Sequence, residues 1–510
     1  DLRLWSPANP FRYGIACAID NGAGGTLDDY GAFPFGFREV HFEPDGLILN
    51  GEKFKLRGLN RHQSYPYIGY AAPARLQRKD ADILKHELNV NLVRTSHYPQ
   101  SPHFLDRCDE IGLLVFEEIP GWQFIGDSDW QALSLDNVQR MIVRDRNHAS
   151  IILWGVRINE SWDDESFYRR TNALAHDLDP TRPTGGVRNF LGSQFLEDVF
   201  TYNDFSNGVA APTQQPHLIT EHNGHMFPTK SYDTEERQME HALRHARVLD
   251  GAYGRPDVMG AIGWCAFDYN THREFGAGDR ICYHGVSDIY RLPKFAAALY
   301  ESQIEPSVRP VLRAGTFWAF GERNETGIDP LLVFSNCEQI RVTVGDEMQG
   351  VYEPARAAFP HLPHAPFLIN GFDGMALFGA NYHDLHLEGL IGGEVVAKQH
   401  VSADGLPDAL TLDADDAAIS ADGADMTRLI VRLTDRYGNR LPYDTCVVTF
   451  EVEGPARLIG DNPLALVGGQ AALYLASTEA AGTVTVTART PRLPDAHVTV
   501  QVQAADEVPI

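Results

Sequence analysis

The chain has 510 residues, of which 43% are hydrophobic and 22% are charged, and its formal net charge is −26. One hydrophobic core does not organise a chain of this length, so two to four domains are expected. The negative charge argues against nucleic acid as a partner, because a phosphate backbone would be repelled, and no run of eighteen or more apolar residues is present to span a membrane.

Residues 1–38 do not fit the pattern of the segment that follows them. They contain one or two candidate strands, which alone could not bury a core. Two interpretations stay open: the strands pack on the next domain, or they are the remnant of a domain whose beginning is missing. No signal or transit sequence opens the chain. A soluble protein is predicted because no apolar run could span a membrane. Because the start is expected to be truncated, cytoplasm, periplasm and secretion stay open as its compartment.

Residues 39–305 alternate between strand and helix patterns. The predicted strands are 53–60, 89–98, 113–119, 151–156, 183–187, 198–204, 217–221 and 260–267, and the predicted helices are 74–88, 101–112, 135–146, 165–179 and 234–252. Eight strands with crossover helices over roughly 250 residues predict a (β/α)8 barrel. An open doubly wound sheet is the alternative, but its glycine-rich phosphate loop does not follow the first strand.

The rest of the chain has an all-β pattern, in which β-branched and apolar residues alternate with polar ones. We predict two sandwich domains, at 306–400 and 401–510. The predicted fold class is therefore α/β, a (β/α)8 TIM barrel followed by two all-β immunoglobulin-like sandwich domains. A structural or docking role is the default interpretation of the sandwiches, with carbohydrate binding as the alternative.

Polar side chains gather at the carboxyl ends of the predicted barrel strands, where barrel enzymes place their chemistry. They are Asn60, Arg61, His62, Arg94, His97, Glu117, Glu118, Asn159, Glu160, Tyr202, Asn203, Asp204, Glu221, Trp264 and Asp268. A lone glutamate at a strand end can cap the next helix, and a lone histidine is more often a core residue than a catalytic one. Independent coincidences at several ends of one rim are much rarer, so the set predicts a catalytic site.

Two of these carboxylates point to glycoside hydrolysis. Glu160 ends the fourth predicted strand and Glu221 ends the seventh, and strands three apart on a ring of eight face each other across its mouth. One carboxyl group can protonate a leaving oxygen while the other attacks the anomeric carbon or activates water. Phosphoryl transfer would need a phosphate cradle and serine hydrolysis a GxSxG elbow, and neither pattern occurs.

The segment NHASIILWGVRINES at 147–161 resembles the acid/base signature of glycoside hydrolase family 2, although Ala149 stands where proline is usual. Further motifs of that family are resembled, in the same order, by RGLNRHQSYP (57–66), NLVRTSHYPQSP (91–102), PHLITEHNGH (216–225) and GAIGWCAFDYNTH (260–272). LRLWSPANPFRY (2–13) resembles the end of the immunoglobulin-like domain that precedes the barrel in this family. The resemblance implies that residues 1–38 are the tail of such a domain.

The resemblance also implies roles for individual residues. Glu160 corresponds to the general acid/base and Glu221 to the nucleophile, with Asn159 bonding the sugar 2-hydroxyl and Arg94 holding the nucleophile ionised. Sugar contacts are implied for four further side chains. They are His62 and His97 for hydroxyls or developing charge, Trp264 as an apolar platform, and His284 where the family often has asparagine.

The sequence departs from the family pattern in several places. The usual tyrosine near the end of strand six is replaced by Phe205, and Tyr202 lies close by but out of register. FEEIPGWQF, after strand three, lacks the histidine of the family's magnesium site, and the six cysteines form no CxxC spacing, so we predict no metal and no cofactor. The Asn-x-Lys pair of the β-glucuronidases has no counterpart, and Arg157 has no assigned role.

These features predict a retaining exo-β-glycosidase that releases terminal β-D-galactosyl residues from an oligosaccharide or other glycoside. A β-glucuronidase or another family 2 β-glycosidase is the alternative within the family. An inactive sugar-binding or scaffold fragment is the alternative of another class, because only the tail of the immunoglobulin-like domain is expected. No nucleic acid or membrane partner is predicted, and homo-oligomerisation is left open.

Overall fold

The computed structural model describes residues 2–324, 328–372, 377 and 382–504. The chain divides into two compact units. The first contains Asp1–His62, Asp80–His222 and Gly251–Trp264, and the second contains Gln63–Lys79, Asn223–Asp250 and Cys265–Ile510. Among the described residues, no helix is both long and apolar enough to cross a membrane.

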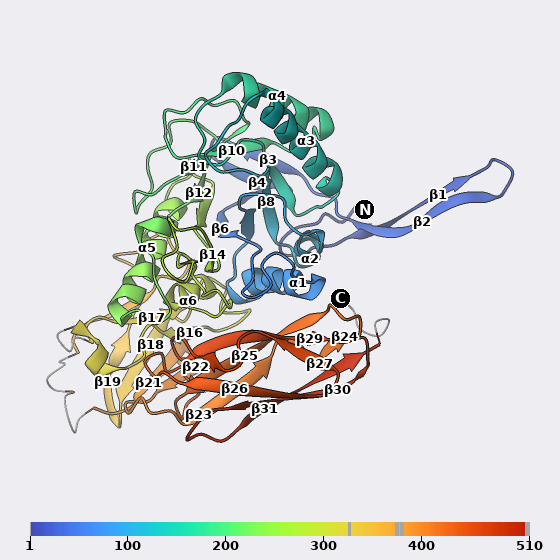
Figure 1. The fold of residues 1–510 in the computed structure, drawn as a ribbon. Coiled ribbons are helices and arrows are strands. Elements are labelled where there is room, and N and C mark those ends of the chain that lie inside the picture. The colour runs from blue at the N-terminus through green and yellow to red at the C-terminus, as the bar shows by residue number, and fades with distance from the viewer. Residues whose placement is uncertain (1, 325–327, 373–376, 378–381, 505–510) are drawn as a thin grey trace. The chain divides into compact units, whose positions relative to one another are not determined.

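The first unit holds a closed barrel of eight parallel strands (Figure 1). Around the barrel they are β6 (Leu56–Arg61), β7 (Leu92–Thr95), β8 (Leu114–Glu118), β9 (Ile151–Gly155), β10 (Thr184–Arg188), β11 (Val199–Asn203), β12 (His217–Glu221) and β13 (Gly260–Gly263), which pairs with β6. The barrel strands are buried along almost their whole length, as parallel strands covered on both faces must be. The predicted barrel is confirmed, with β9 as its fourth strand and β12 as its seventh.

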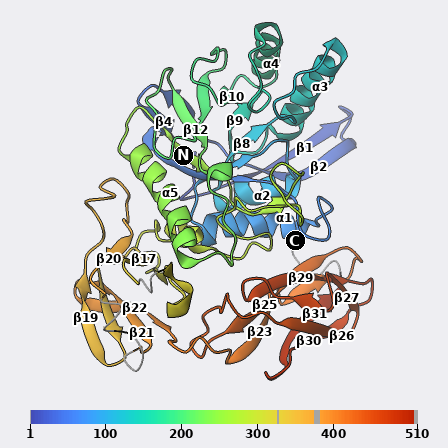
Figure 2. The same ribbon diagram turned by 60° about the vertical axis from the view of Figure 1, so that its left-hand side comes forward.

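Helices occupy five of the connections between successive barrel strands, whereas the connections from β10 to β11 and from β11 to β12 contain none. These helices are α1 (Ala74–Asp82), which continues into a π-helical turn at Ile83–Glu87, α2 (Pro102–Ile111), α3 (Ser128–Asp145), α4 (Glu165–Leu178) and α5 (Glu235–Tyr253). Helices α3 and α4 lie side by side (Figure 2). Helix α3 begins seven residues before the predicted position 135, because the Asp127 carboxylate accepts a hydrogen bond from the Trp130 backbone N–H at 3.1 Å and caps the helix there.

The segment before the barrel contains two small sheets. Strands β1 (Tyr13–Asp20) and β2 (Thr26–Phe35) pair with each other as a two-stranded ribbon, and β3 (Val40–Glu43), β4 (Gly46–Leu49) and β5 (Glu52–Phe54) form an antiparallel sheet. The predicted strand 53–60 was therefore wrong at its start, where residues 53 and 54 belong to β5. Trp5 joins the hydrophobic core of the barrel unit with its side chain fully buried, and its indole N–H donates to the Asp109 carbonyl at 2.7 Å.

The second unit includes most of α1 and α5, and after the barrel strands it contains short elements and β-sheets. The short elements are a 3₁₀ turn at Gly224–Met226, β14 (Tyr269–Asn270), β15 (Ile281–Cys282), α6 (Phe295–Glu301) and a 3₁₀ turn at Phe320–Glu322. A three-stranded sheet of β16 (Leu312–Ala314), β17 (Leu331–Ser335) and β20 (Phe367–Ile369) shares one hydrophobic core with a four-stranded sheet of β18 (Gln339–Val344), β19 (Glu347–Tyr352), β21 (Leu385–Ile391) and β22 (Glu394–Val401).

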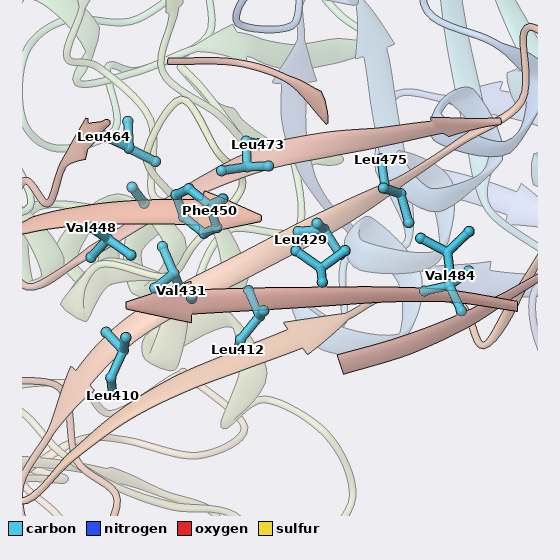
Figure 3. Packing of buried hydrophobic residues seen from close by; sticks show 14 of the residues in the cluster. Leu410, Leu412, Leu429, Val431, Val448, Phe450, Leu464, Leu473, Leu475 and Val484 are labelled. Atoms are coloured by element: carbon cyan, nitrogen blue, oxygen red, sulfur yellow. The ribbon is translucent and has the colours of Figure 1, made fainter. Parts of the chain in front are cut away.

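A second pair of sheets packs around its own core (Figure 3). One sheet contains β23 (Ala409–Ala414), β25 (Met426–Thr434), β27 (Ala456–Ile459) and β29 (Gln470–Ser477), and the other contains β24 (Ala418–Ser420), β26 (Val447–Glu453), β28 (Leu464–Ala465), β30 (Gly482–Arg489) and β31 (Ala496–Gln503). Inward-facing side chains such as Leu429, Val431, Phe450 and Val484 fill the space between them. The predicted all-β sandwiches are confirmed as architecture, while the domain boundaries at 38, 305 and 400 stay predictions. Residues 505–510 of the last predicted domain lie outside the described residues.

Candidate active site

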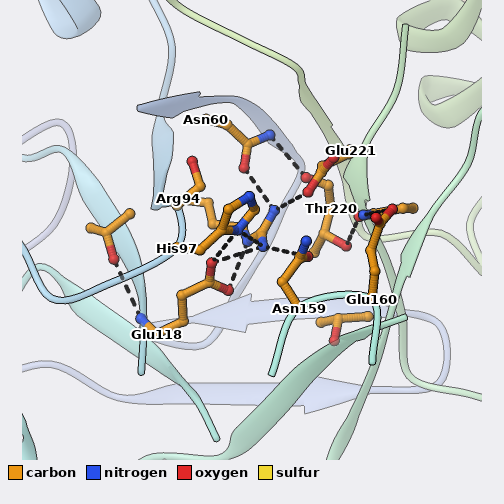
Figure 4. A network of polar contacts seen from close by, with 12 residues as sticks. Asn60, Arg94, His97, Glu118, Asn159, Glu160, Thr220 and Glu221 are labelled. Carbon is orange, nitrogen blue, oxygen red and sulfur yellow. Dashed lines mark hydrogen bonds and ion pairs between the residues drawn. The ribbon is translucent and has the colours of Figure 1, made fainter. Parts of the chain in front are cut away.

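All predicted site residues except His284 belong to the first unit, and they stand at or just after the carboxyl ends of five barrel strands. Arg94, on β7, is fully buried at the centre of this group (Figure 4). Its Nε and Nη2 donate to the two oxygens of Glu118 at 3.0 and 2.8 Å, and its Nη1 donates to Glu221 Oε1 at 2.7 Å. It also donates to the amide oxygens of Asn60 at 3.0 Å and of Asn159 at 2.9 Å.

These five hydrogen bonds use all five N–H groups of the Arg94 guanidinium. The Nδ1 atom of His97 lies 3.0 Å from Arg94 Nη2 and 2.9 Å from Glu118 Oε1. Because both Nη2 hydrogens are already donated to other acceptors, Nδ1 cannot accept a hydrogen bond from Arg94. His97 must donate its Nδ1–H to Glu118, and Nε2 becomes the acceptor of the neutral ring. Burial lowers the pKa of His97, and Arg94 lowers it further against the opposing bond to Glu118, which favours that neutral form.

Glu221 ends β12 and is 6% exposed. Burial raises its pKa to about 8, because the carboxylate loses contact with water, and the nearby Glu160 carboxylate adds to the rise. Arg94 acts in the opposite direction through its hydrogen bond and its charge. The structure places Arg94 beside Glu221, but the arginine does not offset the effect of burial on the Glu221 pKa, so the role of holding the nucleophile ionised stays a prediction.

Glu160 follows β9 directly after Asn159, and its backbone has φ +54°. This left-handed conformation is unusual for a residue with a Cβ atom and costs on the order of 1–3 kcal/mol. Its carboxylate accepts hydrogen bonds from Asn203 Nδ2 at 3.0 Å and from Gln123 Nε2 at 3.3 Å. The strained backbone turns Glu160 away from the path of the strand and aims it at the group that contains Glu221 (Figure 4).

Three rings, those of Trp264, His97 and His62, pack against one another in this group. The Trp264 ring is stacked on His97, with centroids 5.1 Å apart and planes 9° apart, and it meets His62 edge-on at 5.4 Å. His62 Nδ1 lies 3.1 Å from the Tyr98 hydroxyl, and burial lowers the pKa of His62 well below its usual value. The structure brings His62, His97 and Trp264 together as predicted, and their contacts with a sugar stay predictions.

His284 lies in the second unit, where its ring meets Phe275 edge-on at 5.7 Å. Its side chain is buried, and this burial lowers its pKa to about 3, so the ring is neutral. The predicted sugar contact of His284 stays a prediction.

Three residues at the strand ends surround the predicted pair without an assigned role: Asn60 and Glu118 bond Arg94, and Asn203 bonds Glu160. Asn60 donates to the carbonyls of Thr220 at 3.0 Å and Gly263 at 3.1 Å, so it ties β6 to β12 and β13. Thr220 Oγ1 in turn donates to Asn203 Oδ1 at 3.0 Å, which leaves the Asn203 amide hydrogens to point at Glu160. The signal that could have found Asn60, Glu118 and Asn203 was their shared place at the carboxyl ends of barrel strands.

The structure shows which neighbours Tyr202 and Asn203 have at the end of β11. The pairing of β11 with β12 shifts by one residue between Tyr202 and Asn203, so that Asn203 lies opposite Glu221. Tyr202 lies before the shift, paired with Ile219, and its ring contacts that of His217, with centroids 6.1 Å apart. The asparagine therefore occupies the rim position at the end of this strand and bonds Glu160 from it.

Among the described residues, no group of three or more histidine, cysteine, aspartate or glutamate side chains is arranged to hold a metal ion. The absence of a required metal stays a prediction.

Comparison with known proteins gives two family models that match the chain. One is described as "Glycosyl hydrolases family 2, TIM barrel domain" and matches residues 40–225, and the other as "Glycoside hydrolase family 2 C-terminal domain 5" and matches residues 410–499. The first match ends just after Glu221 and includes both carboxylates of the pair.

Curated relatives extend the similarity over most of the chain. A β-galactosidase of Thermoanaerobacterium thermosulfurigenes is 51% identical over 488 residues, which are 92% of this chain and 68% of that protein. A β-galactosidase of Rhizobium meliloti is 41% identical over 501 residues, which are 92% of this chain and 65% of that protein. The chain thus spans about two thirds of the length of these relatives.

Among solved structures, a β-glycosidase from Bacteroides vulgatus has the same fold. The two structures superpose with a TM-score of 0.80 at 23% sequence identity, and the superposition covers 98% of this chain and 70% of the Bacteroides protein.

Proposed function

The chain belongs to glycoside hydrolase family 2, and from this premise we propose that it releases terminal β-D-galactosyl residues from glycosides with retention of configuration. The observation that carries the proposal is the pair of carboxylates at the ends of β9 and β12, of which only Glu221 is bonded to the buried Arg94. The β-galactosidases that match most of the chain support galactose as the sugar.

In the proposed mechanism, Glu221 attacks the anomeric carbon while Glu160 gives its proton to the glycosidic oxygen, and the bond between that carbon and oxygen breaks. The products of this step are the free aglycone alcohol and a galactosyl ester of Glu221. Glu160, now ionised, removes a proton from water, whose oxygen attacks the anomeric carbon and displaces Glu221. Each carboxyl group ends in the protonation state in which it began.

The neighbours of the pair have matching roles in this proposal. Because the amide oxygen of Asn159 accepts from Arg94, its NH₂ group is turned the other way and can donate to the sugar 2-hydroxyl. Neutral His97, with its donor bonded to Glu118, presents Nε2 as an acceptor for a sugar hydroxyl. His62 and Trp264 are proposed to complete the sugar site.

The proposal predicts an unusual pH dependence. With a pKa of about 8, Glu221 gives up its proton only near that pH, and catalysis uses the form of the pair in which Glu221 is ionised and a proton lies on Glu160. We expect kcat/KM to fall as the pH rises through about 8, because the pair then loses its last proton and no acid remains for the leaving group.

The variant Glu160→Gln should reverse the sign of this dependence. With 2,4-dinitrophenyl β-galactoside, whose leaving group needs no proton, its activity should rise with pH as Glu221 ionises. The midpoint should lie below that of the wild type, because the repelling carboxylate is gone. Identical pH profiles for both proteins would contradict the shared proton.

The function itself is tested by a panel of 4-nitrophenyl β-glycosides that contains the galactoside, glucuronide, mannoside and arabinoside. We expect turnover of the galactoside to exceed that of the others, and NMR of the first-formed sugar to show the β-anomer. Preference for another sugar would reject galactose, a first-formed α-anomer would reject retention, and no turnover of any substrate would support a scaffold function.

A further inference from the structure

Arg157, between β9 and Glu160, takes no part in the network around Arg94. Its side chain is fully buried, and its Nη2 donates to the backbone carbonyl of Ser161 at 3.0 Å and to Asp163 Oδ1 at 2.7 Å. The guanidinium lies over the ring of Tyr168 on α4, with 4.7 Å between Cζ and the ring centroid. Arg157 therefore points towards α4 and bonds the chain on the far side of Glu160.

The residue after Glu160 is held from two directions. The Ser161 carbonyl accepts from Arg157, and the Ser161 hydroxyl lies 2.5 Å from the hydroxyl of Tyr168. Asp163 is fixed as well, because it accepts hydrogen bonds from the Ser193 hydroxyl at 2.6 Å and from the Gln194 backbone N–H at 3.0 Å. We call Arg157, Ser161, Asp163 and Tyr168 the Arg157 cluster.

The barrel leaves space for this cluster. Gly186, on β10, has no side chain where it faces Arg157, and a Cβ atom there would collide with the Cβ of Arg157 and lie 2.6 Å from Glu197 Oε1. A glycine on the neighbouring strand is thus part of what lets a buried arginine fit behind the rim.

The Arg157 cluster lies next to Glu160, the residue of the pair with a left-handed backbone. Glu160, at φ +54°, is bonded through its own N–H to the Val187 carbonyl at 2.9 Å, and the Ser161 N–H donates to the Ile158 carbonyl at 3.2 Å. A left-handed glutamate persists only where the surrounding bonds over-determine it. The bonds of Arg157 to Ser161 and Asp163 supply that constraint on the carboxyl-terminal side.

We propose that Arg157 is a positioning residue, which keeps the backbone at Glu160 in its left-handed conformation and so holds the acid/base carboxylate in reach of the leaving group. This inference rests on the proposed function, because it concerns the step in which Glu160 transfers a proton. Arginine suits the task better than lysine because its planar guanidinium stacks on the Tyr168 ring while Nη2 bonds both acceptors.

The test compares Arg157→Met and Arg157→Lys with wild type on two substrates. Lactose needs a proton on its leaving group, whereas 2,4-dinitrophenyl β-galactoside does not. If Arg157 positions Glu160, Arg157→Met should lose about 10²-fold in kcat/KM for lactose, the usual result of a displacement near 1 Å, and change little on the dinitrophenyl substrate. Arg157→Lys should recover part of the loss. The matched control is Arg169→Met, on the exposed face of α4.

Equal losses on both substrates would mean that Arg157 only stabilises the fold, and no loss on lactose would mean that the cluster is dispensable; either result overturns the inference. Thermal unfolding checks that the variants are folded. If Arg157→Met does not fold, Tyr168→Phe, which removes only the hydroxyl bonded to Ser161, must show the same selective loss on lactose. A wild type without activity on the dinitrophenyl substrate would instead reject the proposed function.

Discussion

Replacing Glu221 by glutamine is expected to lower kcat by roughly 10⁴-fold or more for every β-galactoside, because the amide cannot form the galactosyl ester. The loss should not depend on the leaving group, since attack at the anomeric carbon is required whatever departs from it. Glutamine has the shape of glutamate and can still accept a hydrogen bond from Arg94, so the variant should fold. The matched control is Glu165→Gln, an exposed glutamate at the start of α4.

Chemical trapping identifies the nucleophile independently of a loss of activity. A 2-deoxy-2-fluoro β-galactoside with a dinitrophenyl leaving group should inactivate the wild type and add one fluorogalactosyl group to the peptide that contains Glu221. Glu221→Gln should remain unlabelled. A label on Glu160, on Glu118 or on any other residue would disprove the assignment of the nucleophile.

The second large effect is expected at Glu160. Glu160→Gln should lower kcat/KM for lactose by about 10²–10⁴-fold, the usual contribution of a general acid, and should affect 2,4-dinitrophenyl β-galactoside far less. In Glu160→Ala, formation of the galactosyl enzyme from the activated substrate continues, but no base activates the water that must release the sugar. The galactosyl enzyme should therefore accumulate.

Azide provides the positive test of this role. As an anion that attacks without a base, it should accelerate turnover of Glu160→Ala and yield β-galactosyl azide, while the wild type should be unaffected. A variant that loses activity equally on all substrates and does not respond to azide would contradict the acid/base assignment.

The barrel was predictable from the sequence because its strands are short apolar runs with polar ends. The strand predicted at 217–221 is found as β12, His217–Glu221, and the resemblance to glycoside hydrolase family 2 is confirmed. The ends of helices and strands were less predictable where a single residue determines them. Helix α3 starts early because of the Asp127 cap, and the pattern of 53–60 continues through the change from β5 to β6.

The carboxylate pair could also be predicted, since residue type and strand number place each carboxylate on the rim. The hydrogen-bond partners could not, because they depend on how the barrel closes. Asn60 bonds carbonyls that lie 160 and 203 positions further along the chain. A pattern in neighbouring residues cannot predict contacts between residues so far apart in the sequence. The register shift next to Asn203 likewise affects which side chain of β11 faces Glu160, and a one-residue shift leaves no signal in the sequence of so short a strand.

The five bonds of Arg94 also constrain how this site can evolve. Every N–H of the guanidinium has its own acceptor, and those acceptors come from the rim positions of β6, β8, β9 and β12. Removing one acceptor leaves a buried donor without a partner, so the cost of a substitution at Asn60, Glu118 or Asn159 depends on what stands at the other positions. These positions are epistatic: they change in concert or remain fixed, and a library that randomises them one at a time will recover mainly the parental sequence.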